Sequence, residues 1–187
     1  MKNAFLTILF LNIFFVLKAQ TTYYTVFQIG GNLWVANPGY KGAFNGYSAH
    51  FIFGKNFEDR AYLGLGLGNE RFVGKYENKD AQAEFDKAFS YDQNTFPIFI
   101  DARLPLVDGR SFSKIGVLTN LGYAPKLSAQ YDKGFLFKGG LFYLNETPGK
   151  MNWTVSAMYG YQQLTKNIFI KNFQHQQVNI SVGLMIK

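Results

Sequence analysis

Ser48 and His50 are the residues whose types and spacing come nearest to catalytic chemistry. They stand two positions apart in a segment that alternates like a strand, so their side chains would share one face. A lipid-modifying enzyme would need a serine, a histidine and an acid that converge near a membrane rim. The sequence places no acid beside this pair, and a hydrogen-bonded interior histidine is the alternative interpretation of His50. We therefore predict a protein without enzymatic activity and keep a lipid-modifying barrel enzyme as an alternative.

Charged residues form the second group of candidate functional residues. Asp101 and Arg103 share one face of the segment FPIFIDARL, and we expect Glu70, Lys114 and Lys138 to reach the same interior. Charges cannot stay unpaired inside a narrow barrel. The sequence thus predicts a lumen network of these five residues that holds the barrel closed and plugs it. A narrow pore or a carrier for a small apolar molecule is the alternative.

Metal and cofactor chemistry have little support in the sequence. The chain contains no cysteine, which excludes disulfides, thiolate metal sites and lipid attachment at a cysteine. Its two histidines, His50 and His175, are far apart in the sequence. We expect the adjacent acids Glu58 and Asp59 to lie in a turn. We predict no metal and no cofactor.

The chain begins with a pattern typical of export. Residues 1–20, MKNAFLTILFLNIFFVLKAQ, place a lysine, an apolar run and a small residue in the order of a cleaved secretory signal peptide. Residues 21–187 would then form one domain. An exported protein does not meet nucleic acid, so the formal net charge of +7 indicates attraction to anionic lipid head groups. The remaining chain has no long apolar run, and 18% of the residues are aromatic, which favours strands.

Alternation with a period of two recurs in eight segments, each long enough to cross a bilayer as a tilted strand. The predicted strands are residues 23–36, 44–57, 60–73, 94–106, 112–124, 134–145, 152–164 and 176–187. The links between them alternate between compact turns and longer loops, as in outer-membrane barrels. We therefore predict an all-β fold: an eight-stranded antiparallel up-and-down transmembrane β-barrel.

The second face of each segment favours a membrane barrel over a soluble one. A soluble barrel would carry many charges on the face that meets water. Here the second faces are small and nearly uncharged, as in Gly64, Gly66 and Gly68 of YLGLGLG. The three glycines would leave interior space that Phe99 and its neighbours fill from the next strand, while the leucines between them face lipid.

Aromatic residues near the predicted strand ends would form the two girdles at the membrane surfaces. The predicted girdle consists of Tyr23, Trp34, Phe57, Tyr62, Phe72, Phe96, Trp153 and Tyr161. The outer loops, rich in Tyr and Asn, could bind a surface protein or a glycan.

These features together resemble the small eight-stranded outer-membrane barrel proteins, in particular the uncharacterised or secretion-associated ones of Bacteroidetes. The resemblance covers the whole chain and rests on a leader ending KAQ, YLGLGLG, FPIFIDARL, LGYAPK, FKGGLFY and VNISVGLMIK. It implies an outer-membrane protein with a structural or interaction role at the cell surface. The implied partners are outer-membrane lipid and the barrel assembly machinery, and we expect a monomer.

Overall fold

The computed structural model describes residues 21–36, 40–78, 89–109, 112–165 and 173–187. The expected signal peptide, residues 1–20, lies outside the described residues. The strands are β1 (Thr21–Ala36), β2 (Tyr40–Phe57), β3 (Ala61–Asn78), β4 (Phe89–Thr95), β5 (Ile98–Gly109), β6 (Ser113–Ala124), β7 (Tyr131–Asp132), β8 (Gly134–Asn145), β9 (Met151–Leu164) and β10 (Phe173–Ile186). No helix in these ranges is long and apolar enough to cross a membrane.

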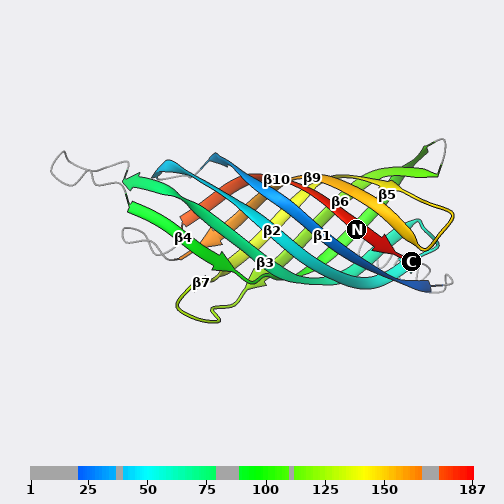
Figure 1. Cartoon of the computed structure of the whole chain (residues 1–187), viewed down its shortest axis with the longest axis horizontal. Coiled ribbons are helices and arrows are strands. Elements are labelled where there is room, and N and C mark those ends of the chain that lie inside the picture. The colour runs from blue at the N-terminus through cyan, green and yellow to red at the C-terminus, as the bar shows by residue number, and fades with distance from the viewer. Residues whose placement is uncertain (1–20, 37–39, 79–88, 110–111, 166–172) are drawn as a thin grey trace, which may run out of the picture.

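The strands close into one antiparallel barrel (Figure 1). Strand β1 pairs with both β2 and β10, and the ladder continues through β9, β8, β6 and β5 to β3, which pairs back to β2. Strands β4 and β5 both pair with β3 and are two parts of one wall strand. The short β7 lies in the connection between β6 and β8 and pairs with β4 in parallel. The wall is therefore an eight-stranded antiparallel barrel, which confirms the predicted fold class.

Pro97 explains why the predicted strand at residues 94–106 is split. Proline has no backbone N–H to donate to a ladder, so pairing with β3 stops between Thr95 and Ile98. One bond crosses the gap, from Gly68 N to Pro97 O at 3.2 Å. Beyond this gap the wall continues further than predicted, because β3 runs to Asn78 and β4 begins at Phe89.

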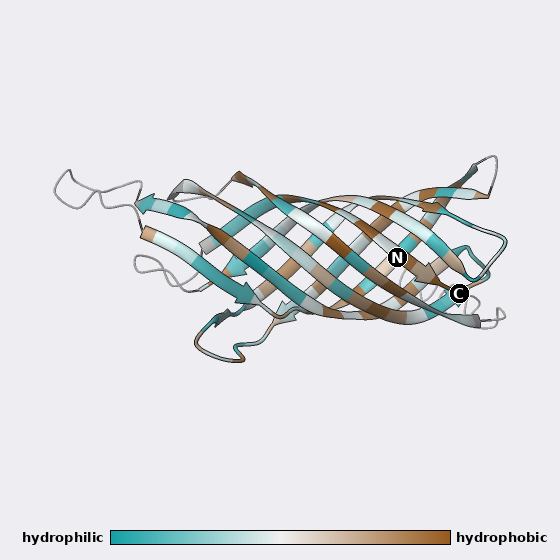
Figure 2. Ribbon diagram, in the orientation of Figure 1, coloured by the Kyte–Doolittle hydropathy of each residue, from teal (hydrophilic) through white to brown (hydrophobic). Residues whose placement is uncertain are grey.

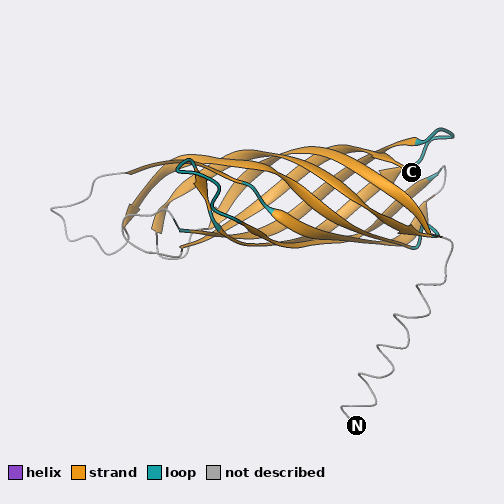
Figure 3. Cartoon of the chain, turned by 90° about the horizontal axis from the view of Figure 1, so that it is seen from below, coloured by secondary structure: helices purple, strands orange, loops and turns teal. Residues whose placement is uncertain are grey.

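The two ends of the barrel differ (Figure 3). At the end where β1 begins and β10 ends, β2 and β3 are joined by the turn of residues 58–60. In this turn Glu58 and Asp59 both have positive φ, of 52° and 57°. At the opposite end, β6 and β8 are joined by the longer segment 125–133 that contains β7. Short turns at one end and long loops at the other are the arrangement of outer-membrane barrels.

Exposed and buried residues alternate along much of the wall, most regularly on β9. Figure 2 shows hydrophobic and hydrophilic residues interspersed along the strands. On β3 the outward Leu63, Leu65 and Leu67 are 50%, 57% and 42% exposed, while Gly66 between two of them and Gly68 after the last are buried. The outer wall as a whole carries a broad set of exposed apolar side chains, and the lumen holds most of the buried polar ones. Apolar-out and polar-in is the alternation of a membrane barrel.

Two of the residues assigned to the aromatic girdles instead point inward, and a third is buried. Tyr62 and Phe72 are 1% and 0% exposed, and Phe57 is 8% exposed although it has the outward parity of Phe53 on β2. Tyr62 and Phe72 have the same parity along β3 as the glycines, so they belong to the lumen face. The girdle prediction was wrong for these residues because it used closeness to a strand end and ignored parity.

Candidate functional site

The largest buried charge cluster lies across the lumen, on β2, β3 and β8. Glu70 on β3 receives a hydrogen bond from the Lys138 ammonium at 2.6 Å, and its Oε1 atom lies 2.8 Å from His50 Nε2. All three side chains are fully buried. Because β5 and β6 separate β8 from β3 in the wall, this contact crosses the lumen between strands that are not neighbours. A buried carboxylate needs such partners to offset its lost hydration.

A second cluster lies nearer the end where β1 begins. Arg103 on β5 donates from Nε to Asp101 Oδ1 at 2.9 Å, and both side chains are fully buried. Tyr24 on β1 donates to the same oxygen at 3.2 Å, while Gln28 accepts from Arg103 Nη2 at 3.2 Å and Thr154 on β9 accepts from Nη1 at 3.5 Å. The i, i+2 spacing of Asp101 and Arg103 thus serves an ion pair that is tied to both β1 and β9.

Lys114 belongs to a third cluster, at the barrel rim. Its ammonium lies 3.5 Å from Asp59 and 3.3 Å from Glu146, and Lys187 pairs with the same two acids. The structure therefore separates Lys114 from Glu70, Asp101, Arg103 and Lys138, with which the sequence analysis grouped it.

The rim cluster perturbs the Asp59 carboxyl, which lies in the turn outside the strands. Partial burial works against ionisation, but hydrogen bonds from Lys187, Tyr62 and Asn56 outweigh it. They hold the pKa of the Asp59 carboxyl well below its usual range. The cluster links the β2–β3 turn to the segment after β8 and to the residue that follows β10.

Ser48 and His50 do both face the lumen, but the structure gives them different partners. The Ser48 hydroxyl accepts a bond from Asn179 Nδ2 at 3.1 Å, whereas His50 is bonded to Glu70. No hydrogen bond joins Ser48 to His50 in the part of the chain that the structure describes. A nucleophile must contact its base to be activated, so this arrangement is that of a buried histidine hydrogen-bonded to a carboxylate.

Sequence reasoning missed an aromatic cluster that lies above Glu70, toward the long-loop end of the lumen. Its buried members are Phe44, Phe72, Tyr76, Tyr91 and Leu164. Phe44 and Tyr91 stack with ring centroids 4.8 Å apart. The signal was present, because Phe72 and Tyr76 continue the inward parity of Gly68 and Glu70 past the predicted strand end at residue 73.

Asp132 on β7 was also missed. Its carboxylate is 1% exposed and accepts bonds from the Tyr91 hydroxyl at 2.7 Å, the Thr165 hydroxyl at 2.6 Å and the Thr165 backbone N–H at 3.0 Å. These bonds fasten the segment between β6 and β8 to β4 and to the end of β9. Nothing in the local sequence around Asp132 indicates these distant partners.

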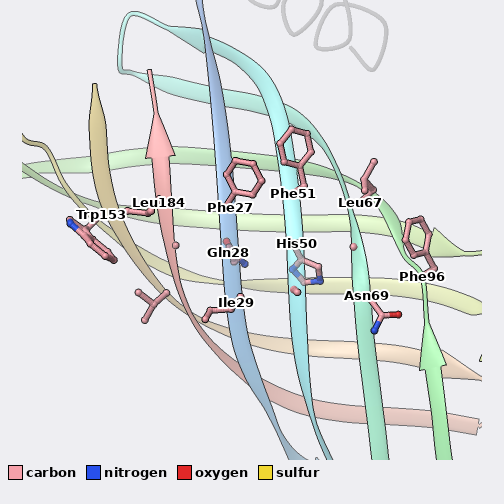
Figure 4. A pocket seen from close by; sticks show the side chains of 14 residues that line it. Phe27, Gln28, Ile29, His50, Phe51, Leu67, Asn69, Phe96, Trp153 and Leu184 are labelled. Carbon is pink, nitrogen blue, oxygen red and sulfur yellow. The ribbon is translucent and has the colours of Figure 1, made fainter. Parts of the chain in front are cut away.

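A hollow of about 530 Å³ lies on the outer wall (Figure 4). It crosses β9, β10, β1, β2 and β3, and its sides are formed by outward residues such as Phe27, Phe51 and Leu67. His50 contributes to its floor, although the imidazole ring itself is buried against Glu70. We find no group of three or more His, Cys, Asp or Glu side chains that could hold a metal ion within the described ranges.

Comparisons with known proteins agree with the fold. No protein-family model matches the sequence, and no curated protein does. The crystal structure of Neisserial surface protein A is similar to this chain, with a TM-score of 0.52 and 15% sequence identity over 89% of this chain and 98% of that one. The β domain of the Bordetella autotransporter BrkA matches over the same shares with a TM-score of 0.30 and 8% identity. The chain therefore shares its barrel fold with Neisserial surface protein A.

Proposed function

We propose that this chain is a non-enzymatic integral protein of the outer membrane whose lumen is closed by its own side chains. The observation that carries the proposal is the pair of fully buried charge clusters, Glu70 with Lys138 and Asp101 with Arg103, at two levels of the lumen. An eight-stranded barrel has an interior just wide enough for side chains to fill. Two ion pairs and an aromatic cluster in series along the lumen support a barrel that is closed to ions.

The outer wall supports the membrane location. Exposed Leu, Ile, Val, Phe and Tyr side chains surround the barrel, and a soluble protein would not expose a patch of that extent. The short turns would lie in the periplasm and the longer loops at the cell surface. Residues 1–20 would direct export as a cleaved signal peptide.

The role that follows is structural, or an interaction through the surface loops with a protein or glycan. Outer-membrane lipid and the barrel assembly machinery would be partners of any such barrel, and the chain would act as a monomer. We also propose that the chain is related to the uncharacterised or secretion-associated barrels of Bacteroidetes. Enzymatic activity is disfavoured because Ser48 bonds to Asn179 and His50 bonds to Glu70.

Ion conductance tests the closed lumen. The mature protein, inserted in a planar lipid bilayer, should leave the conductance at the level of the empty bilayer. The double variant Glu70→Ala with Lys138→Ala removes the cross-lumen contact and should raise the frequency of conducting events. Discrete conductance steps from the unmodified protein would contradict a closed lumen.

A further inference from the structure

Gln28 and His50 are paired residues on adjacent strands, and both point into the lumen. They are ladder partners on β1 and β2, and both are buried. Figure 4 shows the two side chains next to each other. Each belongs to a different charge cluster, because Gln28 Oε1 accepts from Arg103 whereas His50 Nε2 is bonded to Glu70. The two buried clusters of the lumen therefore meet at this pair.

Each of the two side chains keeps one polar atom that is buried and has no hydrogen-bond partner among the residues that the structure describes, Gln28 Nε2 and His50 Nδ1. Arg103 can only donate, so it fixes the Gln28 amide with Oε1 toward the guanidinium and Nε2 as the open donor. In a neutral imidazole, Nε2 carries the hydrogen that is shared with the Glu70 carboxylate, and Nδ1 is then an acceptor. The pair thus presents one donor and one acceptor.

The orientation of the His50 ring directs Nδ1 toward β1. A Cβ atom built on Gly68 of β3 would lie 2.5 Å from His50 Cδ2, so this edge of the ring faces β3. Nδ1 is on the opposite edge of the imidazole and faces the strand that carries Gln28. The other ladder partner of Gln28 is Gly183 on β10, so neither neighbour in this row has a side chain that could pair with the two open atoms.

We propose that Gln28 Nε2 and His50 Nδ1 bind one internal water molecule, which joins the two charge clusters into a single network. Leaving both atoms buried and unpaired is costly, and a water molecule can accept from the amide while it donates to the imidazole. The inference rests on the proposed closed lumen and adds to it a link between the two charged levels. The linked network consists of Lys138, Glu70, His50, the water, Gln28, Arg103 and Asp101.

NMR spectroscopy of the folded protein in detergent micelles tests the water site. The chain has two histidines, so the ring signals of His50 can be assigned. We expect the nitrogen chemical shift of His50 Nδ1 to be that of a hydrogen-bonded acceptor. We also expect a cross-peak between the ring hydrogen beside Nδ1 and the water resonance. A cross-peak to the Gln28 side-chain NH₂ in place of water would overturn the site, because the two residues would then bond directly.

Gln28→Leu removes the donor and should abolish the water cross-peak and shift Nδ1 to the position of a nitrogen without a partner. Gln176→Leu is the matched control, since Gln176 lies on the outer side of β10 and accepts from the Tyr159 hydroxyl. This variant should leave the His50 signals unchanged. Wild-type signals of the same kind in Gln28→Leu would contradict the water site. If Gln28→Leu does not show the mobility shift of a folded barrel, the wild-type signals alone decide.

Failure of the water site and failure of the closed lumen are distinguishable. A wild-type protein that is folded and does not conduct, but has no water cross-peak at His50, overturns the water site alone. Discrete conductance steps from the wild type contradict the closed lumen, whatever the His50 signals show.

Discussion

Gly66 on β3 and Phe99 on β5 are ladder partners, and the Phe99 ring occupies the space that a side chain at position 66 would need. A Cβ atom built on Gly66 would lie 2.3 Å from Phe99 Cε2. On its other side Phe99 pairs with Gly122 on β6, where a Cβ would lie 2.5 Å from Phe99 Cβ. Gly66 of YLGLGLG therefore makes room for a large residue from the neighbouring strand.

Replacing Gly66 with leucine should prevent or strongly slow folding, because overpacking a filled interior costs about 1–3 kcal/mol or more. The measurement is the folded fraction after refolding into lipid vesicles, read from the gel mobility shift. Leu65→Val is the control, since Leu65 is 57% exposed on the outer wall. The double variant Gly66→Leu with Phe99→Ala should recover folding, and an unrescued double variant would contradict the packing explanation.

Removing Lys138 should destabilise the barrel by about 3–5 kcal/mol, because Glu70 would keep its buried charge with only His50 beside it. Urea unfolding in lipid vesicles, comparing wild type with Lys138→Met, measures this. Arg71→Ala breaks the solvent-screened pair with Asp92 and should change stability far less than Lys138→Met does. Similar losses of unfolding free energy in both variants would contradict the prediction that the buried Glu70–Lys138 pair stabilises the barrel more than the exposed pair does.

Asp59 should make stability depend on acid pH. Its pKa is lower in the folded chain than in the unfolded chain, so its contribution is present above the unfolded pKa and disappears as the pH falls through the folded pKa. Stability of the wild type should therefore decline as the pH drops below about 4. Urea midpoints measured from pH 7 downward should fall less steeply for Asp59→Asn, whereas Asp108→Asn, an exposed acid on β5, should behave as the wild type does.

Asp132 should control the mobility of the segment between β6 and β8. In Asp132→Ala the bonds from Tyr91 and Thr165 are lost, so the segment should open more often while the barrel stays folded. Trypsin should then cut faster after Lys126 and Lys133, both exposed on this segment. Asp92→Ala, which breaks only an exposed pair with Arg71, should leave cleavage unchanged. Unchanged cleavage in Asp132→Ala would mean that other contacts hold the segment.

Strand positions and faces could be predicted from the sequence because alternation is a local signal. The segment 134–145 coincides with β8, and Phe99, Asp101 and Arg103 point inward as expected. The break at Pro97 could have been predicted from the missing N–H. Pairs across the lumen could not be predicted from the sequence. The Glu70–Lys138 contact joins residues 68 positions apart, and it depends on how far successive strands are staggered around the barrel. The same holds for Lys114, whose side chain lies at the rim although its strand was correctly placed.

Membrane insertion and closure of the barrel are tested most directly by one gel experiment on outer-membrane fractions of cells that express the chain. The protein should remain with the membranes after washing at high pH, and the unheated sample should migrate at a different apparent size from the boiled one. A protein that fractionates as soluble and shows the same mobility before and after boiling would contradict an eight-stranded outer-membrane barrel.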